Sequence, residues 1–420
     1  MARTLTPQDC HVLMTSIVRQ ATGQTNLTVT DTSSFVSAGE TVLATGMENV
    51  MNSVNMVFGR LIVASRPYKA KFRLLDVSEN DEYSNRLRKD SFYAKDPMAS
   101  GAYNTQLYTN LADGYTSGEN GGASTKSQWE QNQAMPLEFT FGGQSVWDDC
   151  ITMYEVQLQN AFRSEAEFAR FTEGYLQEHS NDIESQHEAF NRMTLLNRIG
   201  MSYDMTASGD INLGAINMTK AFNDYYGLNP GYTTAQLLST YLKDFLAFFV
   251  ATLKEHSDYL TDRGTDYHCP MTKTVGGVQY SILRHTPKDR QRLYMYAPMF
   301  RKAEALVLPE IFHDDYLKIE QYEPVTFWQS KDGGADINIV PAIYDTATGL
   351  QVAGSAVETK VIAVLYDVDA VMTQFILDRA AATPLEARKL YHNVWNHYNK
   401  NAINDPTENC IVFYMEDPTP

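Results

Sequence analysis

The sequence from Ser164 to Gly200, SEAEFARFTEGYLQEHSNDIESQHEAFNRMTLLNRIG, contains no proline and repeats its apolar residues at helical spacing. Ser164 and Glu167 form the Ser-x-x-Glu pattern that caps a helix N-terminus, and Gly200 is the expected C-terminal residue. Seven apolar residues share one stripe: Phe168, Phe171, Tyr175, Ile183, Phe190, Met193 and Leu196. We predict one helix of roughly 35 residues, about 50 Å long at 1.5 Å per residue.

A helix of this length is unusual, because helices in globular proteins average about 11–12 residues. The chain has 420 residues and a formal net charge of −17, with an isoelectric point near 4.9. A protein that holds nucleic acid by its phosphates needs a basic face. The runs Arg86–Lys89 and Lys288–Arg292 are short and diluted by acids, so they predict solvated or acid-paired surface. Nucleic-acid recognition is therefore not expected.

Cysteine spacing and hydropathy set the expected compartment. The four cysteines, Cys10, Cys150, Cys269 and Cys410, lie far apart without a Cys-x-x-Cys pair. This spacing predicts neither a disulfide framework nor a zinc site. The first 20 residues lack the apolar core of a signal peptide, and no window has about 18 consecutive apolar residues. We expect a soluble protein made in a cytoplasm.

The N-terminal region predicts a helix followed by an arm. Pro7 suits the first position of a helix, and Gly23 ends it. Residues 25–44, TNLTVTDTSSFVSAGETVLA, are rich in threonine and serine and predict an extended arm. A second short helix is expected over about 48–58.

Two alternating segments predict a protruding arm. Tyr68–Leu74 and Leu137–Phe141 alternate as strands with one solvated face. The residues between them show little periodicity and include the small-polar run from Ala112 to Gln128. Loops of this length inside a compact domain are commonly functional or disordered. Because an isolated hairpin is marginally stable in water, we expect this arm to lie on a neighbouring molecule.

The remaining chain predicts an α+β domain and a return segment. Residues 145–162 and 384–400 are predicted as amphipathic helices, and a buried helix is predicted to start at Thr233. Strand candidates are Val278–Leu283, Arg292–Tyr296, Glu323–Trp328, Ile337–Ile343, Lys360–Tyr366 and Cys410–Met415. This mixture predicts an α+β domain over about 217–375. The terminal strand is expected to join the region of the long helix.

One pair on the long helix has metal-ligand spacing. Glu184 and His187 form a Glu-x-x-His pattern, but di-iron bundles require two copies with two further glutamates. His392 and His397 are five residues apart, which is unsuitable for zinc ligation on one helical face. Asp367 follows a buried strand and is better explained as the cap of a following helix than as a magnesium ligand. A metal site is the less favoured interpretation.

The order of these parts resembles the major capsid proteins of tailed double-stranded DNA bacteriophages, which have the Hong Kong 97-like fold. Three phrases are similar to parts of that family. RSEAEFARFTEGYLQEHSNDIESQHEAFNRM resembles the spine helix, DTSSFVSAGETVLATGMENVMNSV the N-terminal arm, and ATPLEARKLYHNVWNHYNKNAINDPTENCIVFYM the closing segment. The resemblance covers almost the whole chain and rests on phrases and order.

The resemblance implies an α+β capsid fold with four named parts. These are an N-terminal arm (1–66), an extended β-hairpin E-loop (67–140), a peripheral domain with the spine helix, and an axial α+β domain (217–375). The peripheral domain would comprise residues 141–216, with the spine helix at 164–200, and the return segment 376–420. The N-terminal region is too short and polar for a fused scaffolding segment, so a separate scaffolding protein, or none, is expected.

The resemblance also implies a structural function without catalytic residues, metal or cofactor. Copies would form pentamers and hexamers of an icosahedral head around double-stranded DNA, without sequence-specific contact and without a membrane. Scaffolding, portal and decoration proteins would be further partners. The candidate subunit-interface residues are Tyr68, Lys69, Phe72, Arg86, Arg88, Lys89, Leu137, Phe139 and Phe141. Arg86, Arg88 and Lys89 are the candidate salt-bridge donors to a neighbour.

Three alternatives remain open from the sequence. An encapsulin-type compartment shares the fold but would hold protein cargo instead of DNA. A helical metalloenzyme would use Glu184 and His187. An aromatic-rich carbohydrate-binding protein would use some of the 25 tyrosines and 19 phenylalanines, although their scatter favours packing and subunit contacts.

Overall fold

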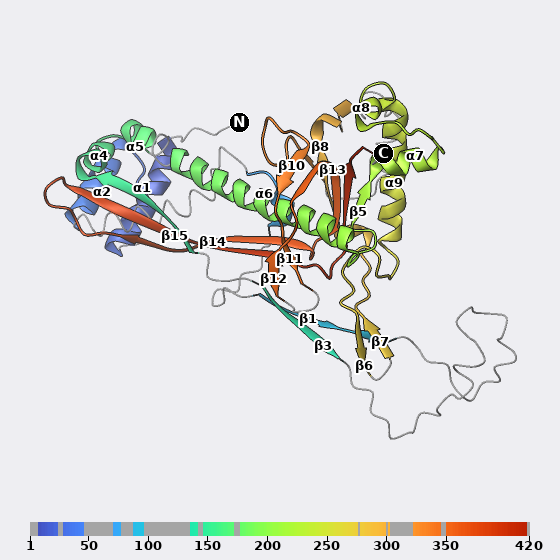
Figure 1. Ribbon diagram of the computed structural model, residues 1–420. Helices are drawn as coiled ribbons and strands as arrows, with labels where there is room; N and C mark the ends of the chain where they lie inside the picture. The colour runs from blue at the N-terminus through green and yellow to red at the C-terminus, as the bar shows by residue number, and fades with distance from the viewer. Residues whose placement is uncertain are drawn as a thin grey trace, which may run out of the picture. The chain divides into compact units, whose positions relative to one another are not determined.

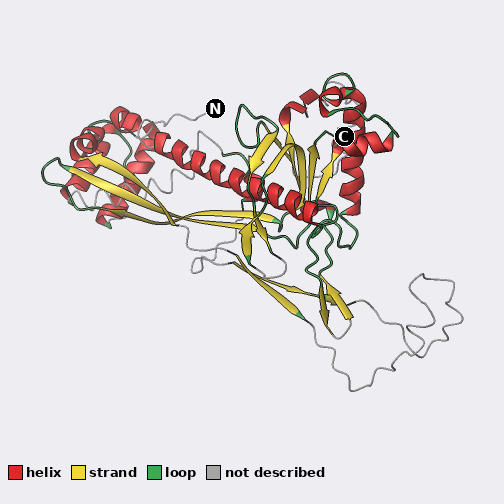
Figure 2. Ribbon diagram, viewed as in Figure 1, coloured by secondary structure: helices red, strands yellow, loops and turns green. Residues whose placement is uncertain are grey.

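Figure 1 shows the chain as a computed structural model. It describes residues 7–23, 28–45, 70–76, 87–95, 135–141, 146–171, 177–275, 278–299, 301–302, 322–345 and 350–417. The chain divides into two compact units. The first comprises Met1–Leu87, Phe141–Arg198 and Val371–Asn404, and the second comprises Arg88–Thr140, Ile199–Ala370 and Asp405–Pro420. Helices and strands occur together in the chain (Figure 2), which confirms the predicted mixed class.

The described α-helices range from 4 to 32 residues in length. They are α1 (Pro7–Thr22), α2 (Thr32–Ala44), α4 (Glu155–Ala161), α5 (Glu165–Phe171), α6 (Gln177–Ser208), α7 (Met218–Tyr225), α8 (Thr234–Leu237) and α9 (Leu242–Tyr259). Short 3-10 helices occur at η1 (Arg73–Leu75) and η4 (Lys288–Arg290). None of these described helices has the length and apolar character needed to span a membrane.

The predicted long helix is present as α5 and α6, with residues 172–176 outside the described part. Ser164 caps α5, because its Oγ accepts a hydrogen bond from the backbone N of Glu167 at 3.2 Å. The predicted end at Gly200 is wrong, since α6 continues to Ser208. Gly209 follows with φ +85°, the left-handed conformation expected at a helix C-terminus.

Close packing explains Gly200 better than helix termination does. A Cβ at this position would lie 2.8 Å from Ile339 Cδ1 and 2.9 Å from Pro341 Cβ. The absence of a side chain thus allows the chain at 339–341 to approach the helix backbone.

The first unit contains a three-stranded sheet with the order β14-β15-β4. Its strands are β14 (Val371–Ala382), β15 (Tyr391–Asn404) and β4 (Val146–Tyr154), all paired antiparallel. The helices predicted at 384–400 and over the first half of 145–162 are therefore wrong; only α4 in the latter range is helical. Burial along β15 alternates with a period of two, but its inward residues include His392, Asn396 and Lys400. Polar side chains alternate with Val394 and Tyr398 on this buried face, so hydrophobic periodicity did not indicate a strand.

A helical cluster in the same unit corrects the predicted extended arm. α2 occupies most of residues 25–44, and its Phe35, Ala38 and Val42 are completely buried. Their spacing of three and four residues is helical, and Phe35 packs edge-on against Phe168 of α5 at 5.7 Å between ring centroids. The threonine and serine content concealed this pattern. The helix predicted from Pro7 is confirmed as α1, with Gly23 at φ +69°, whereas residues 48–58 lie outside the description.

The second unit is built on a six-stranded sheet. The path is β5-β16-β13-β8-β9, and β10 also pairs with β13. The strands are β5 (Ala215–Asn217), β8 (Gln291–Tyr296), β9 (Tyr322–Val325), β10 (Asp336–Ile339), β13 (Val357–Asp367) and β16 (Cys410–Met415). The terminal strand therefore joins β13 and β5, not the sheet of the first unit.

The core of the second unit lies between this sheet and α9. Phe245, Phe249 and Leu253 of α9 pack with Leu365 of β13 and Phe413 of β16 in one buried cluster. The predicted start at Thr233 is confirmed by a complete capping box with Gln236. The single predicted helix is nevertheless divided, since α8 ends at Leu237 and α9 begins at Leu242.

Three small sheets complete the second unit. β1 (Leu87–Phe92) pairs with β3 (Pro136–Phe141); β2 (Ala94–Lys95) pairs with β7 (Val278–Ser281), which also pairs with β6 (Lys273–Val275). β11 (Ala342–Tyr344) pairs with β12 (Gln351–Ala353). We call the β1–β3 sheet the ribbon. The ribbon strand predicted at Tyr68–Leu74 is wrong: the partner of β3 is β1.

Replacing Gly200 with alanine should destabilise the chain by about 1–3 kcal/mol, the usual cost of overpacking. Gly39 of α2 is a matched control, because its Cβ would meet Phe162 Cβ at 3.3 Å, a smaller overlap than the 2.8 Å contact at Gly200. Gly39→Ala should be close to neutral, since alanine also gains up to about 1 kcal/mol of helix propensity. Chemical denaturation of both variants measures the difference. Equal stability of the two variants would contradict the packing role of Gly200.

Lys400 gives a pH-dependent prediction for the first unit. Its Nζ lies 3.0 Å from the centroid of the Trp147 ring, and burial lowers the pKa of Lys400 to about 8. Between pH 8 and about 10.5 the unfolded chain would keep a proton that the folded chain has lost. The free energy of unfolding should therefore rise with pH across this window.

The measurement compares wild type with Lys400→Met at pH 7.5 and 9.5. The difference between the two proteins should shift in favour of wild type at the higher pH. An unchanged difference would show that Lys400 titrates at its ordinary value.

Candidate functional site

The chain enters the predicted loop region through a segment bound to α6. The backbone N of Ala70 donates to Glu184 Oε2 at 3.1 Å, and the backbone N of Lys71 donates to Glu188 Oε2 at 3.2 Å. Arg73 forms an ion pair with the same Glu184 oxygen at 2.5 Å. The two glutamates lie four residues apart and so share one face of the helix. They accept the N–H groups that a neighbouring strand would otherwise bind.

Phe72 shows why this segment is not a strand. It has a left-handed φ of 62° and is 1% exposed, and the Arg192 guanidinium lies 5.2 Å from its ring centroid. The following residues turn into η1. A buried side chain at a positive φ breaks the alternation that the letters YKAKFRL indicated.

Glu184 and His187 therefore hold polypeptide. His187 Nε2 donates to Asp76 Oδ1 at 2.9 Å, and Asn191 donates to the same oxygen at 2.9 Å. Within the described ranges, no group of three or more His, Cys, Asp or Glu side chains could hold a metal ion. The Glu-x-x-His pattern serves to fix the segment 70–76 on α6.

The ribbon has two distinct faces. Lys89 and Ser91 of β1 are half-buried and buried, whereas Asp90 and Phe92 are exposed. In β3, Leu137, Phe139 and Phe141 are at least partly buried, whereas Pro136, Glu138 and Thr140 are exposed. Successive strand residues point to opposite faces, so the ribbon has an inward and an outward face. Phe139, 3% exposed, packs edge-on against Tyr344 of β11 at 5.8 Å.

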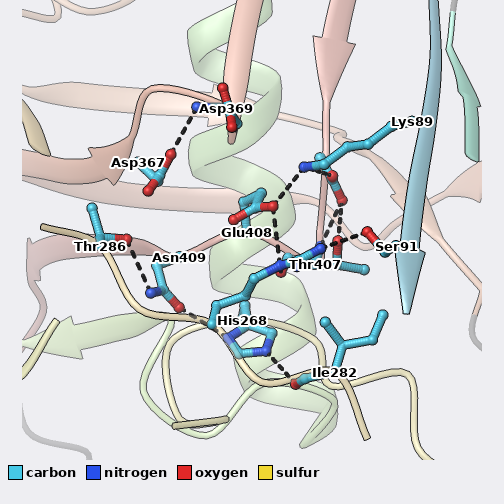
Figure 3. A network of polar contacts seen from close by, with 12 residues as sticks. Lys89, Ser91, His268, Ile282, Thr286, Asp367, Asp369, Thr407, Glu408 and Asn409 are labelled. Carbon is cyan, nitrogen blue, oxygen red and sulfur yellow. Dashed lines mark hydrogen bonds and ion pairs between the residues drawn. The ribbon is translucent and has the colours of Figure 1, made fainter. Parts of the chain in front are cut away.

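A buried charge network holds the inward face of β1 (Figure 3). Lys89 Nζ lies 2.6 Å from Asp405 Oδ2 and 2.6 Å from Glu408 Oε1. Arg284 is the second cation: its Nε lies 3.0 Å from the same Glu408 oxygen, and its Nη2 donates to Ser91 Oγ at 2.7 Å. Two cations thus balance two carboxylates.

The acidic partners lie in the loop between β15 and β16, which is itself buried. Asp405 is completely buried and accepts hydrogen bonds from the backbone N and the Oγ1 of Thr407 at 2.8 and 2.7 Å. The backbone N of Cys269 donates to Pro406 O at 2.8 Å. These bonds fix the Asp405 carboxylate and the backbone of the loop.

His268 supports the loop from the other side. It is completely buried, its Nε2 donates to Ile282 O at 2.8 Å, and its Nδ1 lies 2.9 Å from Asn409 Oδ1. Asn409 also donates to Thr286 Oγ1 at 3.1 Å. Burial lowers the pKa of His268, and the hydrogen bonds to Ile282 and Asn409 partly offset this effect.

Electrostatics in the network favour the charged form of Lys89. Burial opposes that charge, but the nearby Asp405 and Glu408 carboxylates outweigh burial and raise the pKa of Lys89. Burial raises the pKa of Glu408, although Lys89 and Arg284 partly offset this effect. Each buried charge therefore depends on its partners, and removal of one cation leaves an uncompensated carboxylate.

Some of the residues expected at a subunit interface lie outside the described residues, and others contact their own chain. Tyr68, Lys69 and Arg86 lie outside the described residues, as does the side chain of Arg88. Phe72 is buried against α6, and Lys89 binds acids of its own chain. Leu137, Phe139 and Phe141 lie on the inward face of the ribbon. Roles of these residues toward a neighbouring copy stay predictions.

Asp367 caps a turn and not the expected helix. Its Oδ1 accepts a hydrogen bond from the backbone N of Asp369 at 2.9 Å, and the chain continues into β14. Arg290 pairs with both Asp367 and Asp369. The Asp-x-Asp pattern is thus explained by an Asx turn with an arginine partner.

Comparison with known proteins gives the family. A family model of the Phi29-like phage major capsid protein matches residues 80–414. The chain belongs to this family. The protein is therefore a phage major capsid protein and a structural component of the virion, as the sequence resemblance indicated. This membership favours a phage capsid over the encapsulin, metalloenzyme and carbohydrate-binding alternatives.

Two solved phage structures show the similarity of this capsid protein to known chains at low sequence identity. A chain of the capsid structure of Staphylococcus phage Andhra is 11% identical, with a TM-score of 0.48, over 83% of this chain and 84% of that chain. A chain of the bacteriophage P68 structure of head fiber and inner core protein gp22 is 13% identical, with a TM-score of 0.48, over 83% and 85%. No match was found among curated proteins.

Lys89→Ala should destabilise the capsid protein by about 3–5 kcal/mol, the usual cost of breaking a buried ion pair from one side. Lys360→Ala is the matched control, because Lys360 pairs with an Asp336 side chain that is 58% exposed. Surface pairs contribute about 0–1 kcal/mol. Denaturant unfolding of the unassembled chain measures both. Equal losses in the two variants would show that the Lys89 network does not hold the ribbon.

Proposed function

We propose that many copies of this protein self-assemble into the pentamers and hexamers of an icosahedral head enclosing double-stranded DNA. The family match over residues 80–414 carries this proposal. The protein acts without catalysis, and assembly takes place in the cytoplasm of the host bacterium. Separate scaffolding, portal and decoration proteins are its further partners.

The parts of the chain have distinct roles in this proposal. Residues 1–66 form the N-terminal arm, residues 67–140 the E-loop, and residues 217–375 the axial domain around the symmetry axes. Residues 141–216 and 376–420 form the peripheral domain. The six-stranded sheet and the α9 core of the second unit support an axial domain, to which the return segment contributes the strand β16.

The charge of the chain suits a container for DNA. Its net charge of −17 opposes binding to phosphates, so packaged DNA would stay mobile against the wall. Three cations of the second unit support this interpretation, because Lys89, Arg284 and Arg290 are all engaged by carboxylates of their own chain.

The E-loop is proposed to lie across a neighbouring copy. A two-stranded ribbon is marginally stable by itself, and here its inward face has partners in its own unit. The rest of the loop would be stabilised by the next subunit of the shell. Because each contact is repeated in every subunit, individually weak contacts become sufficient for assembly.

Electron microscopy of purified particles tests the proposed function. Expression with the other head proteins should give closed shells that contain this chain and nuclease-protected DNA. Deletion of residues 96–134, with a short glycine-serine connection, should leave a folded chain that forms no normal shells. Particles that hold cargo protein without DNA, or a chain that stays monomeric with its head proteins, would overturn the proposal.

A further inference from the structure

The outward face of the ribbon combines an aromatic anchor with acidic charge. Phe92 is 62% exposed, and Asp90 and Glu138 are exposed on the same face. The inward face is bound through Lys89 and Ser91, so the strands cannot rotate to bury Phe92. A fixed, exposed aromatic residue is the kind of anchor that protein interfaces use.

The turn between β14 and β15 has the complementary character. Leu385 and Leu390 are 39% and 44% exposed, and Arg388 and Lys389 are exposed between them. We call residues 384–390 the hairpin tip. In a chain with a net charge of −17, two adjacent exposed cations between two exposed leucines form a surface opposite in sign to most of the molecule.

The hairpin tip is a built turn. The Glu386 carboxylate accepts hydrogen bonds from the backbone N of Arg388 at 3.2 Å and of Lys389 at 2.7 Å. Both cationic side chains extend from a backbone that is fixed by this carboxylate. Leu390 has φ 54°, a conformation in which glycine or asparagine would be less strained. Backbone strain is often found at functional contacts, and the strained Leu390 exposes its side chain at such a position.

We propose that the outward face of the ribbon in one copy docks on the hairpin tip of a neighbouring copy. Phe92 would pack between Leu385 and Leu390, while Asp90 and Glu138 would face Arg388 and Lys389. This inference rests on the proposed shell function and names the partner surface of the E-loop. It replaces the inward residues Leu137, Phe139 and Phe141 as the contact side.

The two surfaces differ, so the contact is heterologous. The ribbon of one copy binds the next copy, and its own hairpin tip binds the ribbon of another; such a contact forms a ring when the rotation between copies closes. Opposite charge at the contact favours the correct encounter between two strongly acidic chains. The same charges disfavour ribbon-to-ribbon and tip-to-tip pairing.

A charge exchange tests the docking. Arg388→Glu with Lys389→Glu should reduce shell yield about tenfold or more, because like charges then face each other, and Asp90→Lys with Glu138→Lys should do the same. Combining all four substitutions should restore shells. Arg263→Glu with Lys331→Glu, two exposed cations elsewhere in the second unit, is the matched control and should assemble normally. Unassembled chains with wild-type melting curves exclude misfolding as the cause.

Cysteine crosslinking tests the same contact by distance. In a Cys150→Ser background, which removes the exposed native thiol, Phe92→Cys with Leu390→Cys should give covalent multimers when shells are oxidised. Phe92→Cys with Tyr225→Cys is the control, since Tyr225 of α7 is 73% exposed but outside the proposed contact. It should remain monomeric on a denaturing gel.

The outcomes separate this inference from the proposed function. If the wild type forms shells and both charge-reversal pairs also assemble fully, the docking is overturned and the capsid function stays intact. The same holds if wild-type shells form but the double-cysteine variant gives no crosslink between positions 92 and 390. Failure of the combined variant to recover shells would also overturn it. Absence of wild-type shells would instead contradict the proposed function itself.

Discussion

The second unit depends on a buried pair of carboxylates that its own loop cannot neutralise. Asp405 and Glu408 lie in a buried loop. Backbone hydrogen bonds to Ala370 and Cys269 hold this loop. Two buried negative charges are costly without cations, and the cations come from Lys89 and Arg284. The loop that leads into the terminal strand β16 therefore requires a cation from β1, and this ion pairing fixes the ribbon. Its orientation, and so the side it offers to other molecules, follows from that constraint.

A related solution appears in the first unit. Glu184 and Glu188 of α6 accept the backbone N–H groups of Ala70 and Lys71, while His187 and Asn191 bind Asp76. In each unit, polar side chains of one element bind a segment that is distant in the sequence, η1 and the residues before it in the first unit and β1 in the second. The polar positions of the long helix are thus explained by chain attachment. A capsid protein needs such attachment because its loops must hold their direction while copies meet.

Local patterns predicted α1, the capped starts at Ser164 and Thr233, and most strands of the second unit. They failed where the inward face is polar, as in β15, whose His392, Asn396 and Lys400 gave no apolar signal. They also failed at Gly200, which was predicted as the end of the helix. The helix continues, and glycine is needed there because Pro341 packs against its backbone. The network around Lys89 could not be predicted, because its partners lie 316 and 319 positions away. Sequence segments similar to those of capsid proteins indicated the family. The inward and outward faces of the ribbon could be assigned only from the folded structure.

An electron cryomicroscopy map of the assembled shell would locate both faces of the ribbon. Lys89 should remain on Asp405 and Glu408 of its own chain, while Phe92 should contact the hairpin tip of a neighbouring copy. A shell in which Lys89 pairs with another subunit, or in which Phe92 faces solvent, would show that the ribbon is not held and docked in this way.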